Sequence, residues 1–69
     1  MTLAFANMGE EMVIRKIGGN PELKKHLKNL GFVAGSRLTV VSTLGSNMIV
    51  NVKGSRVAIS GEMARKILI

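Results

Sequence analysis

The sequence has no cysteine, two aromatic residues and no long hydrophobic run. Without cysteine, its 69 residues can form neither a disulfide nor a thiolate metal site. Its longest apolar runs are three or four residues, whereas a membrane-spanning helix needs about 20. The first residues show no basic region followed by an apolar stretch, so we predict no signal peptide and no membrane insertion. A cytoplasmic location is the expectation.

Acidic residues are also scarce, because four of them stand against ten Lys and Arg, which gives a net charge of +6. Such an excess favours an acidic partner, namely nucleic acid, an anionic membrane or an acidic protein face. Base stacking on single-stranded nucleic acid needs several exposed rings, and the aromatic content is 3%. Nucleic acid is therefore the weaker alternative, and a protein partner is favoured.

A short helix with its own start and stop signals is predicted from residue 20 to 31. Asn20 can accept hydrogen bonds from the free N–H groups of the first turn, and Pro21 suits the first helical position. Gly31 can adopt the left-handed conformation that ends a helix, and Phe32 then folds back over the last turn. Three leucines at i, i+4 and i+7 form one apolar stripe: Leu23, Leu27 and Leu30. The stripe must be covered by the rest of the chain.

The remaining segments predict short strands, which are rich in β-branched residues or alternate apolar with polar positions. We expect strands at 11–17, 37–43, 47–53, 56–60 and 66–69, with the last pairing with the first. Ser60 can cap a single helical turn before the last strand. The lead-in has three large apolar side chains as candidates to pack on the body: Leu3, Phe5 and Met8. This pattern indicates one domain over residues 1–69, mainly β with one short helix, closed as a small barrel so that few edges stay exposed.

Several stretches resemble the FeoA family, the small cytosolic component of bacterial and archaeal ferrous iron uptake. The most specific is LGFVAGS at residues 30–36, followed by an alternating strand. Weaker matches are Gly9, Ile14 and Ile17, then Gly54 with RVAI at 56–59, and Ala64 with Ile67. Ala34 departs from the family, which often has proline there. The resemblance implies an SH3-like barrel of about five strands with the helix inserted after the first strand.

The same resemblance implies a non-enzymatic protein that docks on the cytoplasmic, GTPase-containing part of a ferrous iron permease. From the residues themselves, the outward face of the helix is the first candidate for such docking, although a solvated lysine face is the plainer interpretation. Val33 and Ile49 are candidate apolar anchors. The candidate partner-binding residues are Lys24, Lys25, Lys28, Val33, Arg37 and Ile49.

Residues that could carry other chemistry do not form a recognisable set. His26 is the only histidine, and only Glu22 is close to it in sequence, whereas a metal site needs several converging ligands. No nucleophile–base spacing or phosphate-binding loop is present. We therefore expect no catalytic residue, no metal site and no cofactor, in a monomer or weak homodimer. Two alternatives remain: ferrous ion sensing, and nucleic-acid binding by a barrel that resembles the SH3-like domain of iron-dependent repressors.

Overall fold

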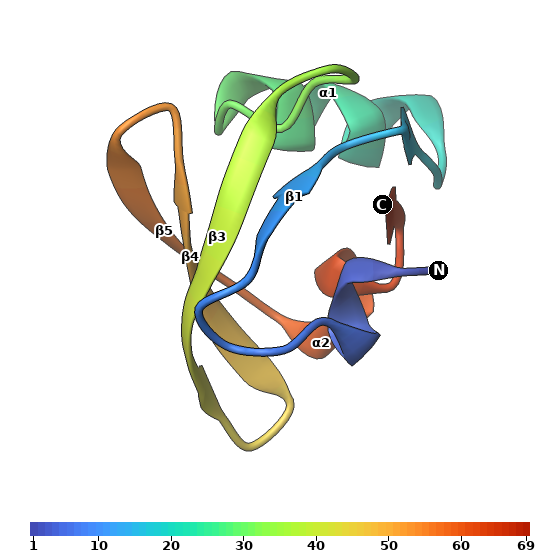
Figure 1. The fold of residues 1–69 in the computed structure, drawn as a ribbon. Helices are drawn as coiled ribbons and strands as arrows, with labels where there is room; N and C mark the ends of the chain where they lie inside the picture. The colour runs from blue at the N-terminus through green and yellow to red at the C-terminus, as the bar shows by residue number, and fades with distance from the viewer.

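The computed structural model describes residues 1–69 and contains six strands in two antiparallel sheets (Figure 1). A four-stranded sheet has the order β1-β3-β4-β5, and β2 pairs with β6 in a second sheet. The fold is thus mainly β, with one two-turn helix after the first strands, as predicted. The elements are η1 (Leu3–Phe5), β1 (Glu11–Val13), β2 (Lys16–Ile17), α1 (Pro21–Asn29), β3 (Arg37–Leu44), β4 (Asn47–Val52), β5 (Ser55–Ile59), α2 (Gly61–Ala64) and β6 (Ile67–Leu68).

The segment 11–17 is two strands rather than the single one that the sequence predicts. β1 pairs with β3, whereas β2 pairs with β6. Ile14 lies at the break and is buried, and its N–H donates to the Ser36 carbonyl oxygen at 2.9 Å. The next N–H, of Arg15, donates instead to the carbonyl oxygen of Leu68 at 2.7 Å. The backbone changes partner within one residue, so the predicted pairing of the two chain ends holds for β2 alone.

Because β1 and β5 are the edges of the larger sheet, the barrel is not closed by a continuous ladder of hydrogen bonds. The smaller sheet lies beside it, and β6 is bonded on both sides, to β2 and through Leu68 to Thr2. The two sheets enclose the core between them. The prediction that few strand edges stay exposed therefore holds for β6, which is bonded on both sides, but not for the edge strands β1 and β5.

Only one of the three apolar side chains of the lead-in packs on the body. Leu3 is fully buried, whereas Phe5 is 74% and Met8 62% exposed. η1 is a single turn, so its side chains point in different directions and one reaches the core. Gly9 then donates its N–H to the Val40 carbonyl oxygen at 2.8 Å, which holds the end of the lead-in beside β3. The prediction for Phe5 and Met8 was wrong.

The β3–β4–β5 meander provides most of the core. Along β4 apolar residues alternate with polar ones, and the apolar face, Met48, Val50 and Val52, is buried. β3 carries a bulge between Val40 and Ser42, which leaves the intervening residue outside the pairing. The twelve residues of the buried cluster are Leu3, Ile14, Leu27, Phe32, Leu38, Val40, Met48, Val50, Val52, Ile59, Ala64 and Ile67.

Helix α1 closes one end of the barrel, and the β3–β4 hairpin projects at the opposite end (Figure 1). Leu27 is fully buried, while Leu23 and Leu30 are half-buried against the core cluster. The predicted leucine stripe therefore faces inward. Fully burying a leucine contributes about 1.5–3 kcal/mol, so burial of the stripe helps to hold this short helix in place.

Candidate docking surface around α1

The ends of α1 are fixed by the residues that the sequence indicates. Asn20 accepts the Leu23 N–H on its side-chain oxygen Oδ1 at 2.7 Å, and Pro21 is the first helical residue. Gly31 has a φ of +106°, and the Phe32 N–H donates to the Leu27 carbonyl oxygen at 2.9 Å. This left-handed ending returns the chain onto the last turn. The outward face of the helix is thereby held at a fixed orientation on the barrel.

Three lysines lie on that outward face: Lys24, Lys25 and Lys28. All are exposed, and none forms an ion pair. Lys24 and Lys28 are one turn apart, so each raises the electrostatic free energy of the other slightly. The face is therefore strongly cationic, and no ion pair from its lysines holds the helix in place.

Two further cations from other segments extend this cationic face. A Cβ built on Gly31 would lie 3.8 Å from the Cδ of Lys53, so the Lys53 side chain runs beside the C-terminal end of α1. Lys53 and Arg37 line the same shallow depression, in which Arg37 Nη1 is 3.8 Å from Glu11 Oε1. We call this set of five residues the basic end: Lys24, Lys25, Lys28, Arg37 and Lys53.

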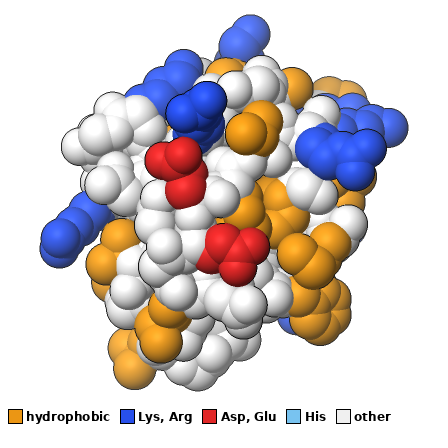
Figure 2. All heavy atoms as spheres, in the orientation of Figure 1, with side chains coloured by type: hydrophobic (Ala, Val, Ile, Leu, Met, Phe, Trp, Pro, Cys, Tyr) orange, Lys and Arg blue, Asp and Glu red, His pale blue; other side chains and the backbone are white.

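Lys53 is absent from the residues proposed on sequence grounds. It occupies the first position of the β4–β5 turn, with a φ of +52°. The charge pattern of the sequence does not indicate that this turn lies beside α1. Its proximity to α1 depends on Val52 lying against Gly31, a contact between residues 21 positions apart in the chain. In Figure 2, Lys and Arg side chains lie along the upper edge and also at the left and right sides of the molecule.

The two candidate apolar anchors lie apart. Val33 is half-buried in the α1–β3 loop, beside the basic end, so it is less exposed than the sequence predicts. Ile49 is 38% exposed on the outer face of β4, where it pairs with Ser42 and Ala58. That position is toward the β3–β4 hairpin rather than α1. The structure therefore brings together the cations and Val33, and leaves Ile49 on another surface.

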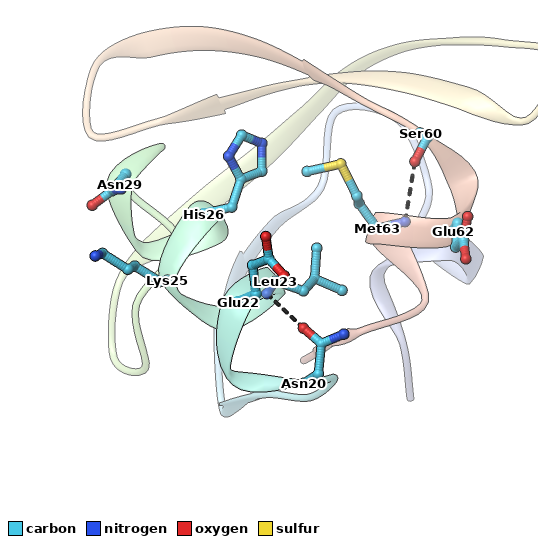
Figure 3. Close-up of a pocket in the computed structure, with 9 residues that line it drawn as sticks. All are labelled: Asn20, Glu22, Leu23, Lys25, His26, Asn29, Ser60, Glu62 and Met63. Atoms are coloured by element: carbon cyan, nitrogen blue, oxygen red, sulfur yellow. Dashed lines mark hydrogen bonds between the residues drawn. The ribbon is translucent and has the colours of Figure 1, made fainter.

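A cleft of about 660 Å³ separates α1 from α2 (Figure 3). Leu23 and Met63 point toward one another across it, while Lys25 points away from Met63. The oxygens of Asn20 and Ser60 are occupied, since each caps its own helix, at 2.7 and 3.2 Å. The cleft is lined by Asn20, Glu22, Leu23, Lys25, His26, Asn29, Ser60, Glu62 and Met63.

The histidine and carboxylates around this cleft do not converge. His26, Glu22 and Glu62 all line it, but no three such side chains in the structure form a group that could hold a metal ion. The cleft thus offers an apolar floor with dispersed polar groups and no constellation for acid–base or metal chemistry. No helix of the structure has the length and apolar character needed to cross a bilayer.

The profile of the FeoA domain matches residues 1–69 of this chain. The chain belongs to the FeoA family. It is 36% identical over 67 residues to an Fe(2+) transport protein A of Methanocaldococcus jannaschii, a match that covers 97% of this chain and 82% of that protein. The resemblance inferred from LGFVAGS is thus confirmed.

Solved structures confirm the fold of this FeoA-family chain. FeoA of Stenotrophomonas maltophilia, described as a prokaryotic SH3 domain protein and crystallised with zinc, superposes with a TM-score of 0.86 and 24% identity over 99% of this chain and 87% of that one. A manganese-dependent transcriptional repressor gives a TM-score of 0.89 at 18% identity, over 97% of this chain and 39% of that one. At these identities the likeness concerns the SH3-like fold alone.

The LGFVAGS segment of this FeoA-family protein is the corner that joins α1 to the sheet. Phe32 in it is fully buried beneath the helix end. Gly35 has a φ of +90° and donates its N–H to the Ile14 carbonyl oxygen at 2.7 Å. Ser36 accepts the Ile14 N–H in return. The segment therefore fixes both the helix and the point at which the first strand changes sheets.

Proposed function

We propose that this chain is a non-enzymatic, cytoplasmic component of ferrous iron uptake that acts as one domain over residues 1–69. Its basic end docks on an acidic face of the cytoplasmic, GTPase-containing part of a ferrous iron permease and modulates that permease. Membership of the FeoA family supports the role in ferrous iron transport. The docking surface is supported by the geometry of the basic end.

The observation that carries the proposal is the convergence of five cations from three segments of the chain. α1 supplies three, β3 begins with Arg37, and the β4–β5 turn adds Lys53. Two carboxylates lie near them, that of Glu11 beside Arg37 and that of Glu22 one turn before Lys25 on α1. Cations that all remain exposed contribute little to folding, but they accelerate association with an acidic surface and make it sensitive to salt. Val33, half-buried in the α1–β3 loop, offers an apolar contact beside them.

The test is an NMR titration of the ¹⁵N-labelled chain with the soluble domain of the permease. We expect the shift changes to concentrate in residues 24–28, 33–37 and 53. The double variant Lys24→Glu/Lys28→Glu should weaken binding at least about tenfold, corresponding to about 1.4 kcal/mol, and the weakening should shrink as salt is added.

A matched control is available at the second sheet. Arg15→Glu/Lys16→Glu changes the net charge equally, but these exposed residues lie at β2, where they line a separate hollow with Met1, Leu68 and Ile69. Binding by this variant should weaken less than binding by the helix variant, because Arg15 and Lys16 line a different hollow from Arg37 and Lys53. Equal weakening by both variants would show that net charge, rather than the basic end, governs docking.

Nucleic-acid binding is a second candidate, because the net charge and the fold shared with a transcriptional repressor both favour it. It predicts an affinity for duplex DNA that falls steeply with salt, with a slope set by the number of phosphates contacted. Titration with duplex and single-stranded DNA at low salt separates the two functions. Ferrous ion sensing, by contrast, predicts saturable binding that His26→Ala abolishes.

A further inference from the structure

Strand β5 is an open edge of the larger sheet. It stands last in the order β1-β3-β4-β5 and pairs with β4 alone. Its pairs with β4 run without a bulge from Val52 with Ser55 to Met48 with Ile59. No backbone hydrogen bond outside that ladder involves residues 55–59. The free side of β5 therefore carries backbone groups that have no partner in the chain. In Figure 1 the β4–β5 turn and the first half of β5 lie at the left margin of the molecule.

The turn geometry shows which residues of β5 carry these unpaired groups. The two residues of the β4–β5 turn have φ values of +52° and +79°, and the pair that closes such a two-residue turn is hydrogen-bonded. That pair is Val52 with Ser55, so Ser55 and every second residue after it bond to β4. The N–H and carbonyl groups of Arg56 and Ala58 therefore point away from β4, toward the free side.

Nothing in β5 itself shields these groups. Arg56 and Ala58 are both exposed. Edge strands are often protected by a proline or a bulge, and β5 has neither. Two outward N–H groups and two outward carbonyl groups, two residues apart, have the spacing of a ladder inside a sheet. The ligand backbone that matches this spacing is another extended peptide chain.

The charge along this edge is positive and uncompensated. No Asp or Glu occurs between residues 23 and 61. Neither Arg56 nor Lys53, which precedes the strand, forms an ion pair. A strand added to β5 places a side chain opposite Arg56, with about 4.5–5.5 Å between the two Cβ atoms, where opposite charges attract and like charges repel. The edge therefore favours an added strand that carries carboxylates.

We infer that the free edge of β5 binds an extended, acidic segment of a partner protein, which adds to the larger sheet as a fifth strand. The backbone groups of Arg56 and Ala58 pair with the segment, and the Arg56 side chain selects its carboxylates. A second copy fits this edge less well. Two β5 edges joined antiparallel about Val57 bring their Arg56 side chains onto neighbouring diagonal positions, about 7–8 Å apart.

This binding goes beyond the docking proposed above. It uses backbone groups of β5 rather than the lysine face of α1, and Lys53 alone borders both surfaces. It does not depend on the identity of the partner as a permease, because any protein that presents an extended acidic segment meets the same requirement. A short peptide is therefore a sufficient probe.

The test is a titration of the ¹⁵N-labelled chain with a short capped peptide in which glutamate alternates with valine. The decisive readout is amide hydrogen exchange. Binding should slow the exchange of the Arg56 and Ala58 N–H groups, which are unpaired in the free chain. Exchange at Ser55 and Val57, which already bond to β4, should change little. Intermolecular NOEs should connect the Hα protons of the peptide with β5.

The matched control peptide is N-methylated at every residue. It keeps each side chain and each charge, but it has no N–H to donate to the edge. It should bind at least about tenfold more weakly than the unmethylated peptide, because several backbone hydrogen bonds are lost at once. This comparison separates pairing with the strand from simple attraction between charges.

Two pairs of variants address the edge from the side of the chain. Ala58→Pro removes one outward N–H, and proline is tolerated at an edge position whose N–H faces away from the sheet. It should weaken peptide binding about threefold to tenfold, whereas Ala58→Val keeps the N–H and should leave binding nearly unchanged. Arg56→Gln should weaken binding about twofold to fivefold. Arg15→Gln removes the same charge at β2 and should have a smaller effect.

The inference is overturned if the N-methylated peptide binds as tightly as the unmethylated one, because charge alone then explains the binding. It also fails if the Arg56 and Ala58 amides are already protected from exchange in the free chain, which would mean that the edge is covered. Self-association of the chain that Ala58→Pro suppresses would make a second copy the occupant. If Ala58→Pro does not fold, the N-methylated peptide and Arg56→Gln still decide the question.

Discussion

Gly61 lies directly against Ser46, with so little space that a Cβ built on Gly61 would stand 2.5 Å from the Ser46 carbonyl oxygen. Gly61 begins α2, and Ser46 is the second residue of the tight turn between β3 and β4. Two segments 15 positions apart thus meet backbone to backbone. Because Gly61 has no side chain, α2 can approach the β3–β4 hairpin this closely.

We predict that Gly61→Ala destabilises the protein. Alanine is favoured over glycine within a helix by about 1 kcal/mol, but overpacking against a backbone atom costs about 1–3 kcal/mol. The net loss should lower Tm by several degrees, because about 1 kcal/mol corresponds to about 4–8 °C in a domain of this size. Gly18→Ala is the control, since its Cβ would meet the Lys66 carbonyl oxygen at an ordinary 3.4 Å. Equal melting temperatures for the two variants would contradict the close approach.

The features that could be predicted from the sequence are those decided by near neighbours in the chain. Asn20 and Gly31 act on backbone groups within four residues, and both ends of α1 were located correctly from them. The inward face of β4 follows from alternation alone. Phe32 was correctly predicted to fold back over the last turn, where its N–H donates to the Leu27 carbonyl oxygen.

The features that were missed depend on contacts between distant segments. The first strand divides at Ile14 because Ser36 and Leu68, each more than 20 residues away, accept successive N–H groups. Lys53 joins the basic end for a similar reason, through the contact of its hairpin with Gly31. No sequence pattern near residue 14 or residue 53 indicates these distant partners. The candidate site was therefore predicted in its helical part and was incomplete elsewhere.

The β4–β5 turn offers a stabilising substitution. Its two central residues, Lys53 and Gly54, have φ values of +52° and +79°. Asparagine adopts positive φ more readily than lysine, and Asn-Gly is the preferred pair for such two-residue hairpins. Lys53→Asn should raise the free energy of unfolding by about 0.5 kcal/mol, as measured by urea denaturation. Lys53→Val, which is β-branched, should lower it, and the reverse order would refute the turn geometry.

Leu27 is the residue through which α1 is held on the barrel. It is fully buried, and its carbonyl oxygen accepts the Phe32 N–H. Leu27→Ala should cost about 2–5 kcal/mol, out of a total stability of about 3–10 kcal/mol for a chain of this length. Most of the population should therefore unfold in moderate urea. Leu30→Ala, at a half-buried position of the same helix, should cost distinctly less; a similar loss would show that the helix is held elsewhere.

Glu11 is the carboxylate that pairs with Arg37 of the basic end, and its removal should strengthen docking. Its Oε1 lies 3.8 Å from Arg37 Nη1, and both side chains are largely exposed, so the pair contributes little to folding. Glu11→Gln leaves Arg37 uncompensated and raises the local charge by one unit. If an acidic face of the permease docks here, the association rate should rise about twofold to threefold at low salt and the salt dependence should steepen.

The neighbouring acid provides the comparison for this prediction. Glu10→Gln alters the net charge by the same unit, but Glu10 lies before β1, where its Oε2 accepts a hydrogen bond from the Asn7 side-chain amide at 3.5 Å. It has no ion pair with the basic end, and its neutralisation should leave the association rate unchanged. Stopped-flow measurements with both variants decide the matter. A faster association rate for Glu10→Gln, or an unchanged association rate for Glu11→Gln, would show that the docking surface lies away from Arg37.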